Sequence, residues 1–248
     1  MVGTNKSLGQ HWLKNREILE QIADLAGEGG LCLEIGPGLG TLTSSLLRRF
    51  SKVMAVEYDA RLAENLPKSF PGKNLEVLNE DILKFDFSQI SGDYVVAGNI
   101  PYYITSPIIE KLLTVSNRPK RIVLLIQKEV AERILSPKES ILSLMVKNRA
   151  KVFAGPEVSR EEFTPPPKVD SKVIVLEPLK NQIVSDEVFK LIRLGFVSPR
   201  KKLVANLAGI LSRDELKKGF LDLGISLDAR PADLELEDWK KLYEILYK

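Results

Sequence analysis

A glycine-rich turn between an apolar run and a helical pattern sets the strictest limit on how this chain can fold. Residues 31–35 are mostly apolar and lead directly into Gly36-Pro37-Gly38-Leu39-Gly40, and from Thr41 onward the apolar residues take helical spacing. In a strand, glycine turn and helix, the backbone can approach a ligand closely, and the amino end of the helix faces that ligand. The turn therefore predicts a ligand site at the carboxyl end of a buried strand.

Three further apolar runs end at polar side chains in the same way. Each run is typical of a buried strand: residues 53–56 end at Glu57, residues 75–78 shortly before Asp81, and residues 94–97 shortly before Asn99. Glu57 lies 21 residues after Gly36, which is the spacing at which an acid accepts hydrogen bonds from ribose hydroxyls in nucleotide-binding βαβ units. Either acid alone could instead be a helix cap or a solvated strand end. Together the runs predict an α/β fold with polar groups along one sheet edge.

The segment Gly98-Asn99-Ile100-Pro101-Tyr102-Tyr103 follows the fourth of these runs. Pro101 fixes its own backbone torsion and restricts Ile100 to an extended conformation, so the Asn99 amide and the Tyr102 ring have a stiff support. An amide beside an aromatic ring suits a flat molecule that carries an NH2 group. The alternative is a proline turn whose tyrosine fills the core.

Composition excludes several classes of protein. One cysteine, Cys32, and one histidine, His11, are too few for a disulfide or for a His/Cys zinc site, so no metal is expected. The net charge of +3 is too small for a whole-chain nucleic-acid signature, so any such signal must be local. The longest uncharged segment, residues 94–109, is too short and polar to span a bilayer. We expect a cytoplasmic protein that does not enter a membrane.

The pattern of apolar residues changes after Pro178. Only helical patterns follow, separated by Pro199, Ser212, Gly224 and Pro231. We therefore predict two domains: a cofactor-binding and catalytic domain over residues 1–182, and a small helical domain over residues 183–248.

Combined, these motifs resemble the S-adenosylmethionine-dependent methyltransferases, and more narrowly the ribosomal RNA adenine N6-dimethyltransferase family. The resemblance runs from Gln10 to about Leu211 and rests on these segments: residues 9–13 (GQHWL), 33–40 (LEIGPGLG), Glu57, Asp81, 99–102 (NIPY), 127–130 (QKEV) and 163–171 (FTPPPKVDS). It implies a Rossmann-like sheet that is mostly parallel with an antiparallel last strand, and a small all-helical C-terminal domain that binds RNA.

The resemblance also implies roles for individual residues. It assigns S-adenosylmethionine, which is converted to S-adenosylhomocysteine, to a set of cofactor-binding residues: His11, Leu13, Gly36, Gly38, Glu57, Asp81 and Asn99. Asn99 and the Ile100 carbonyl would accept hydrogen bonds from the target amine, and Tyr102 and Phe163 would stack on the two faces of the flipped base. For Phe163 the alternative is a loop residue that anchors on the sheet edge.

Two stretches without acidic residues, 111–128 and 190–202, are candidate RNA contacts. The predicted RNA-binding residues are Lys120, Arg121, Lys128, Arg200, Lys201 and Lys202. A solvated helix face is the alternative for each stretch.

The function that the resemblance implies is N6-dimethylation of two adjacent adenosines near the 3′ end of small-subunit (16S) ribosomal RNA. The expected partner is ribosomal RNA in an immature small subunit, and the enzyme is expected to be a monomer. Two alternatives remain: a large-subunit adenine methylase of the macrolide-resistance type, and a non-catalytic RNA-binding assembly factor. Three features depart from the family pattern: His11-Trp12, Tyr103 and a shortened segment at residues 137–144.

Overall fold

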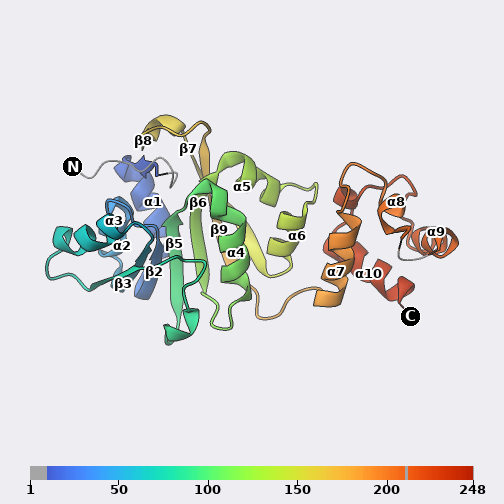
Figure 1. Ribbon diagram of the computed structural model, residues 1–248, viewed down its shortest axis with the longest axis horizontal. Coiled ribbons are helices and arrows are strands. Elements are labelled where there is room, and N and C mark those ends of the chain that lie inside the picture. The colour runs from blue at the N-terminus through green and yellow to red at the C-terminus, as the bar shows by residue number, and fades with distance from the viewer. Residues whose placement is uncertain (1–9, 210–211, 248) are drawn as a thin grey trace. The chain divides into compact units, whose positions relative to one another are not determined.

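The computed structural model describes residues 10–209 and 212–247, which divide into two compact units (Figure 1). The first unit runs to Ala131 and includes Lys151–Pro178, and the second comprises Glu132–Ala150 and the chain from Leu179 onward. The C-terminal part of the second unit starts at Leu179, near the predicted boundary at residue 183, but the unit also includes residues 132–150, which the prediction places in the first domain.

A seven-stranded sheet forms the centre of the first unit, in the order β4-β3-β2-β5-β6-β9-β7. Its strands are β2 (Gly29–Ile35), β3 (Phe50–Glu57), β4 (Leu75–Asn79), β5 (Tyr94–Asn99), β6 (Arg121–Gln127), β7 (Ala150–Val158) and β9 (Ser171–Pro178). The four pairings from β4 to β6 are parallel, and β9 runs antiparallel to β6. The mostly parallel sheet with an antiparallel last strand is thus confirmed.

Helices α1 to α6 lie between strands along the chain, and helices α7 to α10 follow the last strand, β9. The α-helices are α1 (Arg16–Ala26), α2 (Thr41–Leu46), α3 (Ala60–Asn65), α4 (Thr105–Thr114), α5 (Lys128–Leu135), α6 (Ile141–Lys147), α7 (Asp186–Gly195), α8 (Leu203–Leu207), α9 (Arg213–Asp222) and α10 (Leu236–Leu246). The 3-10 helices are η2 (Leu66–Ser69), η3 (Phe87–Gln89), η4 (Tyr102–Ile104), η5 (Arg160–Glu162) and η6 (Pro231–Asp233). No helix of the described residues is both long and apolar enough to cross a membrane.

Helix α1 shows how local sequence produces these elements. The side chain of Asn15 accepts hydrogen bonds from the Glu17 and Ile18 amides, which satisfies two free donors at the helix start. Gly27 ends the helix with a φ of 89°. The buried residues recur at helical spacing: Leu19, Ile22, Ala23 and Ala26. This apolar stripe packs in one core cluster with α2 and with alternate residues of the sheet, and each large buried side chain contributes roughly 1.5–3 kcal/mol.

A short two-stranded ribbon lies apart from the main sheet. β1 (Trp12–Leu13) pairs antiparallel with β8 (Phe163–Thr164), so that Trp12 faces Thr164 and Leu13 faces Phe163. Both Leu13 and Phe163 belong to the core cluster of α1. The ribbon therefore ties the N-terminal arm, residues 10–13, to the loop that precedes β9.

In the second unit, Trp239 of α10 is fully buried and explains the glycine at position 195 of α7. A Cβ at Gly195 would lie 2.3 Å from Trp239 Cη2, so a larger residue could not fit without displacing the indole. The segment that departs from the family pattern is also anchored here, because Glu139 accepts hydrogen bonds from Lys147 Nζ and Ser143 Oγ, each at 2.6 Å.

Candidate active site

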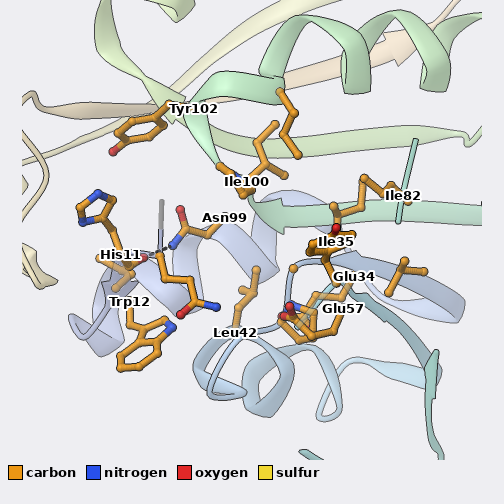
Figure 2. A pocket seen from close by; sticks show the side chains of 18 of the residues that line it. His11, Trp12, Glu34, Ile35, Leu42, Glu57, Ile82, Asn99, Ile100 and Tyr102 are labelled. Atoms are coloured by element: carbon orange, nitrogen blue, oxygen red, sulfur yellow. Dashed lines mark hydrogen bonds between the residues drawn. The ribbon is translucent and has the colours of Figure 1, made fainter. Parts of the chain in front are cut away.

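A cavity of about 350 Å³ opens in the first unit at the carboxyl ends of β2, β3 and β5 (Figure 2). β2 lies between β3 and β5, so the order of the strands reverses at this point, which is where open α/β sheets bind ligands. Most of the lining comes from five segments, residues 10–13, 34–37, 56–58, 80–83 and 99–104, and α1 and α2 contribute Leu19, Ile22, Thr41 and Leu42. The sequence predicted this edge of the sheet.

Glu57, the last residue of β3, is held by two backbone donors. Its Oε2 accepts from the Gly38 amide at 3.1 Å, and its Oε1 accepts from the Asp59 amide at 2.8 Å. Burial raises the pKa of Glu57, while these backbone hydrogen bonds oppose the shift. Gly38 itself does not line the cavity: it has a φ of 58°, and a Cβ there would lie 3.1 Å from Trp12 Nε1. Gly38 therefore acts on the site through Glu57.

Glu34 is a second buried carboxylate in the lining, and no role was predicted for it. It is 1 % exposed, and its Oε2 has no hydrogen-bond partner among the residues that the structure describes. Burial raises the pKa of Glu34 to about 8, and the charge of Glu57 adds to the shift. Figure 2 shows both acids on the side of the cavity opposite His11 and Tyr102. A charged residue within an apolar run was the signal in the sequence.

Asp81 lines the cavity from the turn after β4. Its Oδ1 accepts from the Leu83 amide at 2.9 Å. Lys111 of α4 holds this turn, because its Nζ donates to the carbonyls of Leu83 and Phe85, each at 2.7 Å. Burial lowers the pKa of Lys111. The sequence placed Lys111 in a stretch of candidate RNA contacts, and nothing local to it indicated this role.

Asn99 ends β5 at the opposite side of the site. Its Nδ2 donates to the His11 carbonyl at 3.0 Å, which leaves Oδ1 as the acceptor that no described residue occupies (Figure 2). Ile100, 1 % exposed, and Pro101 follow in the lining. Tyr102 is fixed by a 2.8 Å hydrogen bond between its hydroxyl and Ser171 Oγ, and burial raises its pKa. The amide and the ring are thus presented together, as the Asn99 motif predicted.

The two residues predicted to stack on the target base are not brought together. Phe163 is 2 % exposed in the core cluster and does not line the cavity. The ring beside Tyr102 is instead that of His11, with the ring centroids 6.1 Å apart and the planes inclined by 21°. Leu13 is buried, yet it reaches the cavity lining. A stacking role for Phe163 stays a prediction that this conformation does not support.

Most of the predicted RNA-binding cations have acidic partners from other segments. The ion pairs are Lys120–Asp93 (2.5 Å), Arg121–Glu177 (2.7 Å), Lys128–Glu157 (2.6 Å) and Lys202–Asp228 (2.5 Å). Arg200 and Lys201 are exposed. Exposed pairs contribute only about 0–1 kcal/mol, so a phosphate could replace these acids. Among residues 10–209 and 212–247, no group of three or more His, Cys, Asp or Glu side chains could hold a metal ion.

Comparison with known proteins gives one consistent picture. A family model described as "Ribosomal RNA adenine dimethylase" matches residues 1–248. Proteins named "Ribosomal RNA small subunit methyltransferase A" are similar over nearly the whole chain: that of Thermosynechococcus vestitus is 36% identical, covering 99% of this chain and 98% of its own, and that of a Nostoc species is 39% identical, covering 99% of each.

Two solved structures share the fold over almost the whole chain. A dimethyladenosine transferase from Plasmodium falciparum is 32% identical with a TM-score of 0.80, covering 94% of this chain and 96% of its own. The 23S rRNA methyltransferase ErmE is 27% identical with a TM-score of 0.79, covering 96% of this chain and 100% of its own. Both are methyltransferases, in agreement with the Rossmann-like methyltransferase sheet that the sequence predicted.

Proposed function

The chain belongs to the ribosomal RNA adenine dimethylase family, and on that premise we propose that it dimethylates N6 of two adjacent adenosines near the 3′ end of small-subunit ribosomal RNA. The methyl donor is S-adenosylmethionine. We propose further that the enzyme acts as a monomer in the cytoplasm on an immature small subunit. The observation that carries the proposal is the pairing, in one cavity, of two strand-end acids with the free acceptor of Asn99.

The cofactor side of the cavity suits a nucleoside that carries positive charge. Glu57 lies at the strand tip where ribose hydroxyls bind in such sheets, and Asp81 lies at the next tip. Glu34 Oε2, buried without a described partner, is the kind of group that a nearby cation would keep ionised. When bound, S-adenosylmethionine supplies an electrophilic methyl group. Gly36, with a φ of 65°, lets the backbone approach the ligand closely.

The acceptor side suits an exocyclic amine. The lone pair of an adenine amine is delocalised into the ring, so this amine is a poor nucleophile. Two acceptors aimed at its hydrogens, Asn99 Oδ1 and the Ile100 carbonyl, would favour a pyramidal nitrogen with its lone pair directed at the methyl group. Positioning of this kind accounts for most of the gain when the methyl donor is already activated. The proposal requires no general base.

RNA would be held by the exposed cations on the two units. We assign phosphate contacts to Lys120, Arg121 and Lys128 of the first unit, and to Arg200, Lys201 and Lys202 of the second. Such contacts supply affinity that falls steeply with salt and carries little sequence information. The choice of target adenosine would then depend on the shape of the RNA around the flipped base.

The test is to incubate the purified protein with labelled cofactor and small subunits that lack the modification, and then to map the product. We expect N6-dimethyladenine at two neighbouring positions near the 3′ end. The likeness to ErmE supports a large-subunit adenine as the second candidate, so intact large subunits form the matched arm. Label confined to that arm would contradict the proposal. A Glu57→Ala variant that kept its function in cells would instead favour a non-catalytic assembly factor.

A further inference from the structure

Two aromatic rings face each other across the acceptor side of the cavity. His11 on the N-terminal arm and Tyr102 on η4 both line the cavity, with ring centroids 6.1 Å apart and planes within 21° of parallel (Figure 2). Two stacked van der Waals contacts of about 3.5 Å each need about 7 Å between outer planes. The gap between the two planes is at most the centroid distance, so a flat base could enter between these rings if they separated by at least about 1 Å.

Both rings are held by hydrogen bonds from separate segments. The Tyr102 hydroxyl bonds to Ser171 Oγ at 2.8 Å, and His11 Nδ1 lies 2.7 Å from the Pro165 carbonyl. Because a carbonyl oxygen can only accept, Nδ1 carries the hydrogen. The His11 carbonyl in turn accepts from Asn99 Nδ2 at 3.0 Å. One residue thus fixes both a ring face and the orientation of the amide that would bind the target amine.

Phe163 explains why the His11 ring stands where it does. Its ring is buried in the core with Leu13, and the pairing of β8 with β1 puts Leu13 opposite Phe163. The buried Phe163 ring fixes the position of Pro165, two residues later, and the Pro165 carbonyl orients the His11 imidazole. The proline-rich loop therefore contributes to the site by holding the His11 ring, while its own aromatic residue, Phe163, stays in the core.

We propose that the imidazole of His11 is the second stacking surface for the flipped target adenine, opposite Tyr102. The inference rests on the proposed function and specifies the base-binding part of that site. The His11 side chain then contacts substrate RNA, whereas its main chain stays with the arm that closes the cofactor side. Because any base can stack between two rings, the His11–Tyr102 pair would supply affinity, and Asn99 would supply specificity for a base that carries an amine.

The test compares three substitutions that separate a flat ring from a polar group. In His11→Phe the plane remains and the hydrogen bond to Pro165 is lost; in His11→Asn a polar side chain remains without a plane; His11→Ala removes both. Base stacking of the usual strength predicts that kcat/KM for unmodified small subunits falls about 5- to 100-fold in the Ala and Asn variants. We expect His11→Phe to stay within about threefold of the wild type by retaining the ring. Cofactor affinity, measured by equilibrium dialysis, should not follow the loss.

Lys14→Ala is the matched control, because it changes an exposed side chain directly after the same arm and leaves the backbone bond from Lys14 to Glu162 intact. Thermal melts confirm that each variant is folded. An Asn variant as active as the wild type, or a Phe variant as impaired as Ala, would overturn the inference, and so would a loss of cofactor binding that matches the loss of rate. A wild-type enzyme that labels no small-subunit adenine would instead remove the proposed function itself.

Discussion

The two sides of the cavity are assembled in different ways. On the cofactor side, the bonds that fix Glu57 join residues 19 and 2 positions apart in the sequence. On the acceptor side, the bonds join residues 88 positions apart for Asn99 and His11, 154 for His11 and Pro165, and 69 for Tyr102 and Ser171. Successive βα units bring the first set to one edge of the sheet, whereas the second set depends on the fold as a whole.

The largest effect expected from this difference is on stability. Phe163→Ala should lower the free energy of unfolding by about 3–5 kcal/mol, because it leaves a cavity in the core that anchors the acceptor side. Phe153 lies on β7 and is 47 % exposed, so Phe153→Ala is the control and should change the free energy of unfolding by less than about 0.5 kcal/mol. Urea unfolding measures both. A Phe163 variant that is as stable as the control but inactive would contradict the core role and favour a stacking role for Phe163 in the base-binding site.

Removal of the free acceptor tests the acceptor side directly. Asn99→Ala should lower the single-turnover rate of methyl transfer by about 10²- to 10³-fold, since the target amine loses a preorganised hydrogen-bond partner. Asn74→Ala removes an exposed amide that bonds to the Ser51 carbonyl and should leave the rate unchanged. If the Asn99 variant reacts within threefold of the wild type, the amide does not orient the amine.

The buried acid of the cofactor side should make stability depend on pH. The pKa of Glu34, about 8 in the folded protein against a usual 4.5, is raised, so the folded state favours the protonated form. Stability from this group is complete below about pH 4.5 and is lost as the pH rises through about 8. Glu34→Gln mimics the protonated form, so its free energy of unfolding should exceed that of the wild type by a few kcal/mol at pH 9, but not at pH 4.

Thermal melts of the two proteins from pH 4 to 9 measure this difference. Glu64→Gln, an exposed acid on α3 whose side chain is 76% accessible, is the control and should follow the wild type. Parallel pH profiles for the Glu34 variant and the wild type would show that the carboxyl is solvated in the free protein.

Loss of the charge on Glu57 should weaken the cofactor side without changing the acceptor side. Glu57→Gln replaces charge-assisted hydrogen bonds with neutral ones, so we expect the Kd for S-adenosylmethionine to rise about 10- to 30-fold. Glu76→Gln, on the neighbouring strand β4 and ion-paired with Lys52, is the matched control. Calorimetric titration gives both values. An unchanged Kd for the Glu57 variant would show that this acid does not bind the cofactor.

The smallest effect should follow loss of the bond that fixes Tyr102. Ser171→Ala removes a hydrogen bond of about 0.5–1.5 kcal/mol, so KM for the RNA should rise about 2- to 10-fold while cofactor binding is unchanged. Thr114→Ala, whose hydroxyl donates to the Glu110 and Lys111 carbonyls of its own helix α4, is a control outside the site. A larger effect on kcat than on KM would mean that Tyr102 acts in the chemical step.

The difference between short-range contacts on the cofactor side and long-range contacts on the acceptor side explains what the sequence could predict. Glycine turns, strand ends and the spacing from Gly36 to Glu57 are local features, so they predicted the sheet and the cofactor side. Phe163 could not be placed in advance, because an aromatic residue in a proline-rich loop fits both a core and a binding site. The ion pair of Lys128 with Glu157 was equally hidden, since its acid lies on a distant strand. The sequence shows which groups are present, but tertiary packing decides which of them meet.

A crystal structure with S-adenosylmethionine bound tests the central claim most directly, because both sides of the cavity must meet at the methyl group. We predict that the ribose hydroxyls contact Glu57 and that the sulfonium methyl points toward the space between Asn99 Oδ1 and the Ile100 carbonyl. A methyl group directed away from Asn99, or a cofactor bound outside this cavity, would contradict the account.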